Sequence, residues 1–196
     1  MNTHALDGYP KAAAGQDSAL DTASARWLTI LGRLERTTVA DPAIRVLQRT
    51  IRSLPLGDAR DLLRGGPLGH PVHPVLVQVP IGCWLSAAVL DAVVPGSQRA
   101  ATALTAVGLA GAVPAAAAGW VDWAALPPES ARVGLAHAVS NVGAVACYTA
   151  SLRARLCGRS AKGRLWSFSG LAMVAVTGAL GGHVAYRQTV GADLRR

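Results

Sequence analysis

The feature that most constrains this chain is an apolar run from Val75 to Val94, which carries no charged side chain before Asp91. At 1.5 Å per residue, a helix of about 20 residues crosses a hydrocarbon core of roughly 30 Å. Three further apolar stretches follow it, separated by short linkers. The sequence therefore predicts an all-α integral membrane protein, a four-helix bundle with spans at about 74–94, 100–120, 133–152 and 165–186.

The composition agrees with a membrane protein. Apolar residues make up 51% of the chain and charged residues 15%, against about 25% charged in a typical soluble domain. The net charge of +8 comes from arginines that flank apolar segments, not from a basic face with interleaved aromatic side chains. We therefore expect the lipid bilayer as the main partner and no nucleic acid.

A basic, amphipathic extension precedes the first span. Ile44, Leu47 and Ile51 recur at helical spacing, and arginines occupy the opposite face. Such helices next to a span lie on the lipid interface, or they form a docking or dimerisation surface that would make a homo-oligomer. The predicted organisation is a disordered tail at 1–18, a helical extension at 19–68, a four-span domain at 69–190 and a short tail at 191–196.

Antiparallel alternation of the spans predicts one polar layer. The start of span one, the link between spans two and three, and the end of span four must lie on the same membrane side. That side collects four of the five histidines and one carboxylate: His70, His73, Asp122, His137 and His183. This histidine-rich layer is the strongest functional signal in the sequence.

Two of these histidines are candidate cofactor ligands. His137 and His183 lie at similar depth on consecutive spans, and Asn141 is one turn deeper than His137 on the same face. Facing histidines in a helical bundle are a common way to hold a haem b or a metal ion, and Asn141 could fix a histidine tautomer or contact a ligand. The alternative is structural hydrogen bonding without any cofactor.

The other pair, His70 and His73, is a candidate metal site together with Asp122. Each histidine precedes a proline, which favours extended or polyproline geometry and places the two rings about 9 Å apart on one edge. They would then bind metal only with a partner such as Asp122 or His183. In the alternative interpretation, His73 is simply the N-cap of the first span.

Two further polar residues receive structural roles. Asp91 lies near the opposite interface, where we expect an ion pair with Arg99; a proton path is the alternative. Arg132 is expected to form an interfacial ion pair near Asp122 and Glu129. The sequence contains no Ser-His-Asp order, carboxylate pair in a pocket, P-loop or Gly-x-Gly-x-x-Gly turn, so it does not favour an enzyme.

Four separated motifs resemble a bacterial membrane family known as domain of unknown function 2231. They are Gly69–Gly82, Gly119–Trp123, His137 with Asn141, and Gly181–Tyr186. The resemblance implies a four-span domain of undefined activity in the bacterial cytoplasmic membrane. Some relatives resemble fusions to a Rieske iron–sulfur domain, a context that implies electron transfer. This chain has no Cys-x-His…Cys-x-x-His pattern, so we expect any such partner to be a separate protein.

The leading hypothesis is therefore a membrane electron-transfer subunit that binds haem or metal in the histidine-rich layer. The alternative is a cofactor-free membrane anchor for a soluble redox partner. A weaker alternative is a small transporter that uses Asp91 and the proline-interrupted spans.

Overall fold

The computed structural model describes residues 14–193, and within that range it consists of helices and their connections. The all-α prediction is confirmed. Residues 1–13 and 194–196, which belong to the two predicted tails, lie outside the described residues. The helices are α1 (Ala14–Arg36), α2 (Asp41–Ser53), α3 (Asp58–Arg64), the short 3₁₀ helix η1 (Gly66–Leu68), α4 (His73–Leu76), α5 (Gln78–Val93), α6 (Gln98–Trp123), α7 (Pro128–Leu156) and α8 (Ser160–Asp193).

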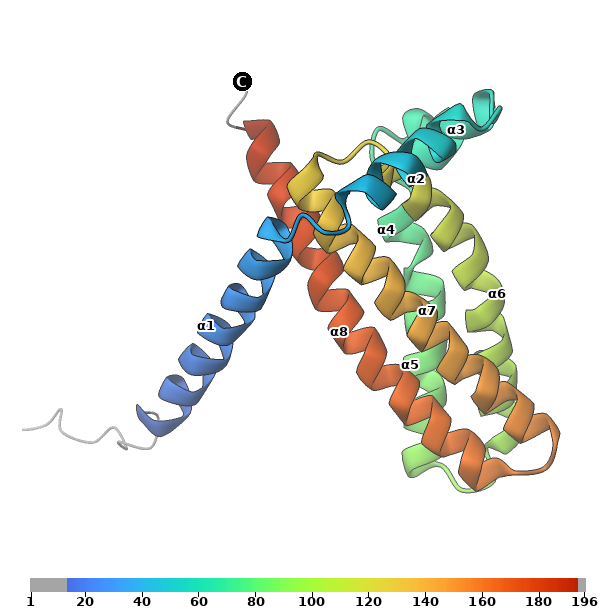
Figure 1. The fold of residues 1–196 in the computed structure, drawn as a ribbon. Coiled ribbons are helices and arrows are strands. Elements are labelled where there is room, and N and C mark those ends of the chain that lie inside the picture. Colours follow the sequence, from blue (N-terminus) through green and yellow to red (C-terminus); the bar gives the residue numbers. More distant parts are fainter. Residues whose placement is uncertain (1–13, 194–196) are drawn as a thin grey trace, which may run out of the picture.

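Four long segments are apolar enough to cross a membrane, as predicted. They are His73–Val93, Gln98–Trp123, Pro128–Leu156 and Ser160–Arg187. The first consists of α4 and α5, with the break at Val77, three residues before Pro80. Pro80 cannot donate a backbone hydrogen bond to the preceding turn, which accounts for a break at this point. Figure 1 shows these segments side by side as a four-helix bundle.

The bundle consists of two hairpins, α4/α5 with α6 and α7 with α8. In each hairpin, a glycine on the second helix leaves room for a large aromatic ring from the first helix. A Cβ on Gly108 would lie 2.3 Å from Nε1 of Trp84, and one on Gly170 would lie 2.8 Å from Cε2 of Tyr148. The two rings then stack on each other between the hairpins, with centroids 4.0 Å apart and planes 10° apart.

The two hairpins are copies of one pattern. Three pairs of residues that meet between the first helices of the hairpins are each separated by 64 positions in the sequence: His73 with His137, Trp84 with Tyr148, and Asp91 with Arg155. On the second helices, the glycines that accept side chains recur 62 positions apart: Gly108 with Gly170, and Gly119 with Gly181. The hairpins are therefore related by an approximate two-fold axis, and the three pairs lie along it.

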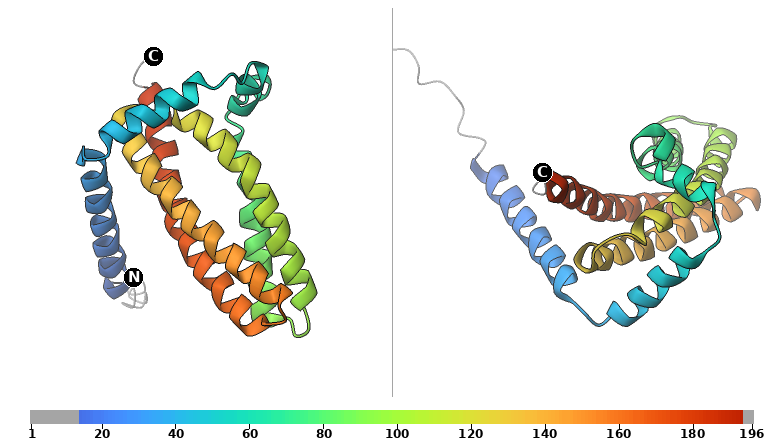
Figure 2. Two further views of the ribbon diagram at one scale, coloured as in Figure 1. Left: turned by 45° about the vertical axis from the view of Figure 1, so that its right-hand side comes forward. Right: turned by 90° about the horizontal axis from the view of Figure 1, so that it is seen from above.

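The N-terminal extension packs on one end of the bundle. Figure 2 shows α2 crossing that end and α1 diverging from the bundle. Ile44 and Ile51 of α2 pack against Trp123 and Ala131 at the α6–α7 connection. The side chain of Gln48 donates to the carbonyl oxygens of Trp123 and Leu126, at the end of α6 and in the connection that follows it.

Candidate functional site

The predicted histidine-rich layer lies at the end of the bundle that α2 covers. His73 begins α4, His137 lies on α7 and His183 lies on α8, whereas His70 is in the exposed connection before α4. These histidines contact different residues. The contacts of each one identify which of them lie together.

His73 is held against α6. Its Nδ1 donates to the carbonyl oxygen of Ala115 at 2.8 Å. The ring fits there because Gly119 has no side chain: a Cβ at that position would lie 2.9 Å from Nδ1 of His73. His73 is the first residue of α4 and is not extended, so the structure agrees, within one residue, with the alternative in which His73 caps the first span. Proline is well tolerated in the first helical turn, and here Pro74 follows His73 directly.

His137 makes the matching contacts in the second hairpin. Its Nδ1 donates to the carbonyl oxygen of Thr177 on α8 at 2.8 Å. A Cβ on Gly181 would lie 2.8 Å from Cε1 of His137, so glycine is again what admits the ring. The side-chain amide of Asn141 lies 3.0 Å from Nε2 of His137. Asn141 therefore lies on the same face as His137 and contacts its ring.

His73 and His137 meet between the two hairpins. Their ring centroids are 6.3 Å apart and their planes are nearly perpendicular, at 87°. A backbone carbonyl only accepts hydrogen bonds, so Nδ1 of each ring carries a proton. At His137, the amide nitrogen of Asn141 can donate to Nε2. The pair thus brings together two imidazole rings from different hairpins, each oriented by a hydrogen bond to the neighbouring helix.

His183 belongs to a different group. Its Nε2 lies 2.9 Å from a carboxylate oxygen of Glu35 on α1, and Arg187 donates to the other oxygen at 2.7 Å. Burial by itself would raise the pKa of Glu35, but the hydrogen bond from His183 and the charges of Arg187 and His183 outweigh it and lower the pKa. The structure thus joins His137 to His73, and it joins His183 to the N-terminal extension.

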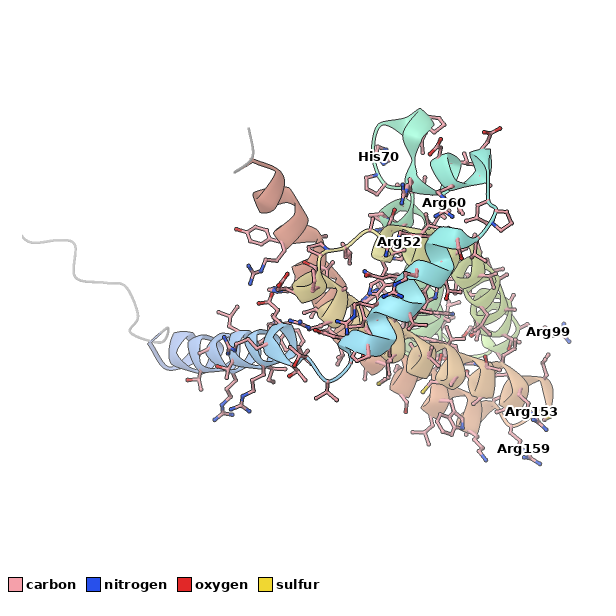
Figure 3. The ribbon with its side chains drawn as sticks, turned by 45° about the horizontal axis from the view of Figure 1, so that its top comes forward. Arg52, Arg60, His70, Arg99, Arg153 and Arg159 are labelled. Carbon is pink, nitrogen blue, oxygen red and sulfur yellow. The ribbon has the colours of Figure 1, made fainter. Side chains whose placement is uncertain are left out.

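The remaining members of the predicted metal site, His70 and Asp122, have different surroundings. His70 is exposed, and its Nδ1 lies 3.1 Å from the carbonyl oxygen of Pro71, the next residue. Figure 3 shows His70 on the outer connection beside the end of the bundle. Asp122, in the last turn of α6, lies within electrostatic reach of His73 and Arg64. Among the described residues, no group of three or more His, Cys, Asp or Glu side chains is arranged to hold a metal ion.

The predicted ion pair between Asp91 and Arg99 is wrong, because Asp91 pairs with Arg155 of α7. The two side chains are 0% and 1% exposed and form two hydrogen bonds. Arg155 also donates to the hydroxyl of Ser151 at 3.1 Å, and Ser151 donates to the carbonyl of Gly163 at 2.7 Å. A carboxylate neutralised in this way gives no support to the transporter alternative.

Arg132 also has a different partner from the one predicted. Both of its bonds to Asp41, at the start of α2, measure 2.7 Å, and neither Asp122 nor Glu129 takes part in this ion pair. The hydrogen bond from Arg132 lowers the pKa of Asp41. The extension folds onto the bundle and brings Asp41 within reach of Arg132. The two residues are far apart in the sequence, so this ion pair could not be inferred from sequence distance.

Sequence reasoning missed Thr177, Arg155 and the pairing of His73 with His137. The available signal was the internal repeat. The pattern His-x₉-Cys-aromatic begins at His73 and again at His137, with Cys83 and Cys147 at the matching positions. Aligning these two copies would have matched Trp84 with Tyr148 and, seven residues further on, Asp91 with Arg155.

The fold and its layer of polar side chains define a class, the polytopic α-helical membrane proteins. Within that class, the family model described as predicted membrane protein (DUF2231) matches residues 69–194. The match covers more than half of the chain, so the chain belongs to this family. No curated protein and no solved structure matches it.

Proposed function

We propose that this protein is the membrane subunit of an electron-transfer system, and that His73 and His137 are the two protein ligands of a haem b or of a single metal ion. The observation that supports the proposal is the close approach of the two rings, 6.3 Å between centroids. Two imidazole nitrogens that share one metal, each at about 2.0–2.1 Å from it, place their ring centroids about 6 Å apart.

The hydrogen bonds of the two rings also fit this role. Histidines that bind metals almost always donate their second ring nitrogen to a carbonyl or carboxylate, which fixes the tautomer and the ring orientation. His73 does so to Ala115 and His137 does so to Thr177, both at 2.8 Å. A metal bound by Nε2 of His137 would take the place of the hydrogen bond from Asn141. The donor set therefore suits a metal that takes two imidazoles from the protein.

The number of protein ligands restricts which cofactor or metal ion the histidine pair could bind. If the protein supplies only two ligands, the remaining ligands would have to come from the group itself, as in haem, or the ion would have to accept a low coordination number, as Cu(I) does. Either group supplies one-electron chemistry when bound. The resemblance to fusions with a Rieske domain then favours a separate iron–sulfur protein as the electron-transfer partner.

The second candidate function is a cofactor-free membrane anchor for a soluble redox protein. It is supported by the way the extension is fixed to the bundle, through Asp41 with Arg132 and Glu35 with His183. These contacts hold α2 across the end of the bundle and leave its Arg45 exposed. In this case the histidine pair serves only to join the two hairpins.

Visible spectroscopy of the detergent-purified full chain tests the proposal. The protein is produced in haem-supplemented cells, its oxidised and dithionite-reduced spectra are recorded, and iron, copper and zinc are measured on the same sample. A sharp reduced α-band with about one haem per chain establishes haem b. One metal per chain without a Soret band establishes the single-ion alternative. A colourless, metal-free protein refutes both and leaves the anchor.

Three histidine variants assign the ligands. His73→Ala and His137→Ala should each abolish binding of the cofactor, because each removes one of the two ligands. His183→Ala is the matched control, since it removes a histidine of the same layer whose Nε2 is bonded to Glu35. If His183→Ala abolishes binding and His73→Ala retains it, the ligand pair proposed here is wrong.

A further inference from the structure

A hollow of about 350 Å³ lies at the end of the bundle opposite the histidines. It is formed where α7 ends and α8 begins, and Figure 3 shows Arg153 and Arg159 projecting at that end of the molecule, as does Arg99. The lining combines three cations with an aromatic ring and small apolar residues: Arg153, Arg159, Lys162, Trp166, Ala150 and Ala154. Cys157 completes the lining.

Within residues 14–193, none of the ion pairs involves a cation of this hollow. The sequence contains no Asp or Glu between Asp91 and Asp122, and none between Glu129 and Asp193. Asp91, the carboxylate that the described part of the bundle places near this end, is already paired with Arg155. The hollow is therefore a concentration of positive charge that only a ligand or counter-ion can balance.

The internal repeat shows that the fold itself does not require these cations. The turn of the first hairpin has the same helix-to-helix role, yet Val89 stands at the position equivalent to Arg153 and Ala100 at the position equivalent to Lys162. Leu104 likewise stands at the position equivalent to Trp166. The first hairpin closes its turn without these cations and this aromatic ring. The basic and aromatic lining of the second hairpin is therefore not needed to form the turn.

The position of the hollow identifies the class of ligand. It lies at the ends of two membrane spans, where Leu156 and Leu165 are 73% and 67% exposed in the structure and must face lipid tails. Trp166 lies beside them, at the level where interfacial aromatic residues contact headgroups. Basic pockets between spans at this level bind the headgroups of anionic lipids. We propose that this hollow binds the phosphate headgroup of an anionic phospholipid.

The proposal is independent of the function proposed for the histidine pair. Its test is the affinity of the detergent-purified full chain for phosphatidylglycerol, compared with phosphatidylcholine, followed by native mass spectrometry during lipid titration. The variant Arg153→Val/Lys162→Ala installs the residues of the first hairpin, which close the same kind of turn. With about fivefold contributed by each cation near the headgroup, we expect the double variant to lose roughly 30-fold in affinity.

Arg99→Gln is the matched control, because it removes a cation from the other turn at the same end. We expect Arg99→Gln to retain the binding of phosphatidylglycerol. Circular dichroism of each variant verifies that the helices are intact. Equal affinity for the two lipids, or an unchanged affinity in the double variant, overturns the proposal. Displacement of phosphatidylglycerol by millimolar inorganic phosphate would identify a site for free phosphate and would also overturn it.

Discussion

The buried ion pair between Asp91 and Arg155 permits the most quantitative prediction. The two side chains are almost completely inaccessible, they form two hydrogen bonds, and they join the two hairpins at the end opposite the histidines. Removing one partner of such a pair leaves an uncompensated buried charge, at a cost of about 3–5 kcal/mol. Asp91→Leu and Arg155→Met should each lower the free energy of unfolding by that amount.

The double variant Asp91→Leu/Arg155→Met distinguishes this explanation from a simple loss of contacts. Replacing both charges by apolar side chains removes the desolvation penalty together with the attraction, and such replacements are often neutral or stabilising. If the two single effects were independent, the double variant would lose about 6–10 kcal/mol. We expect instead a free energy of unfolding within about 2 kcal/mol of the wild type.

The assay is reversible unfolding in mixed detergent micelles with increasing sodium dodecyl sulfate, followed by far-ultraviolet circular dichroism. Ser151→Ala supplies an intermediate case, because it removes the hydroxyl that accepts from Arg155 but leaves the ion pair in place. Single variants that each cost less than about 1 kcal/mol, or a double variant whose loss equals the sum of the single losses, would refute the assignment of Asp91 and Arg155 as one coupled buried pair.

Two further predictions concern the histidine end. Gly181→Ala places a methyl group 2.8 Å from Cε1 of His137 and should lower the free energy of unfolding by about 1–3 kcal/mol, whereas Gly178→Ala meets nothing within 4 Å and should raise it by up to about 1 kcal/mol. The pKa of Glu35 is lowered in the folded chain, so its contribution to stability is present above about pH 4.5 and is lost as the pH falls through the folded pKa. Between pH 5 and pH 3 the wild type should therefore lose more of its Tm than Glu35→Gln does, as measured by thermal melting.

Two results would contradict these predictions. Equal changes in the free energy of unfolding for alanine at Gly181 and at Gly178 would mean that the His137 ring can move away from α8. The close packing of that ring against Gly181 would then be wrong. A Tm that falls by the same amount in the wild type and in Glu35→Gln would mean that the carboxylate of Glu35 is not stabilised by its contacts with His183 and Arg187.

The sequence contained most of the information about membrane insertion. Apolar stretches of about 20 residues must span the bilayer as helices, since backbone polar groups have no other partners in lipid. Alternation of the spans then placed His73, His137 and His183 on one side without any knowledge of packing. The four-helix class and the family resemblance depended on these local signals, and both are confirmed.

Only the tertiary structure decided which polar groups meet. Side chains project at about 100° intervals around a helix, so the partner of His137 depends on how α7 and its neighbours are rotated and packed, which hydropathy does not encode. Asp91 illustrates the same point. Arg99 is nearer in the sequence, but the packing of the two hairpins places Arg155 beside Asp91. Span length is a local property of the chain, whereas pairing across an axis is a property of two packed hairpins together.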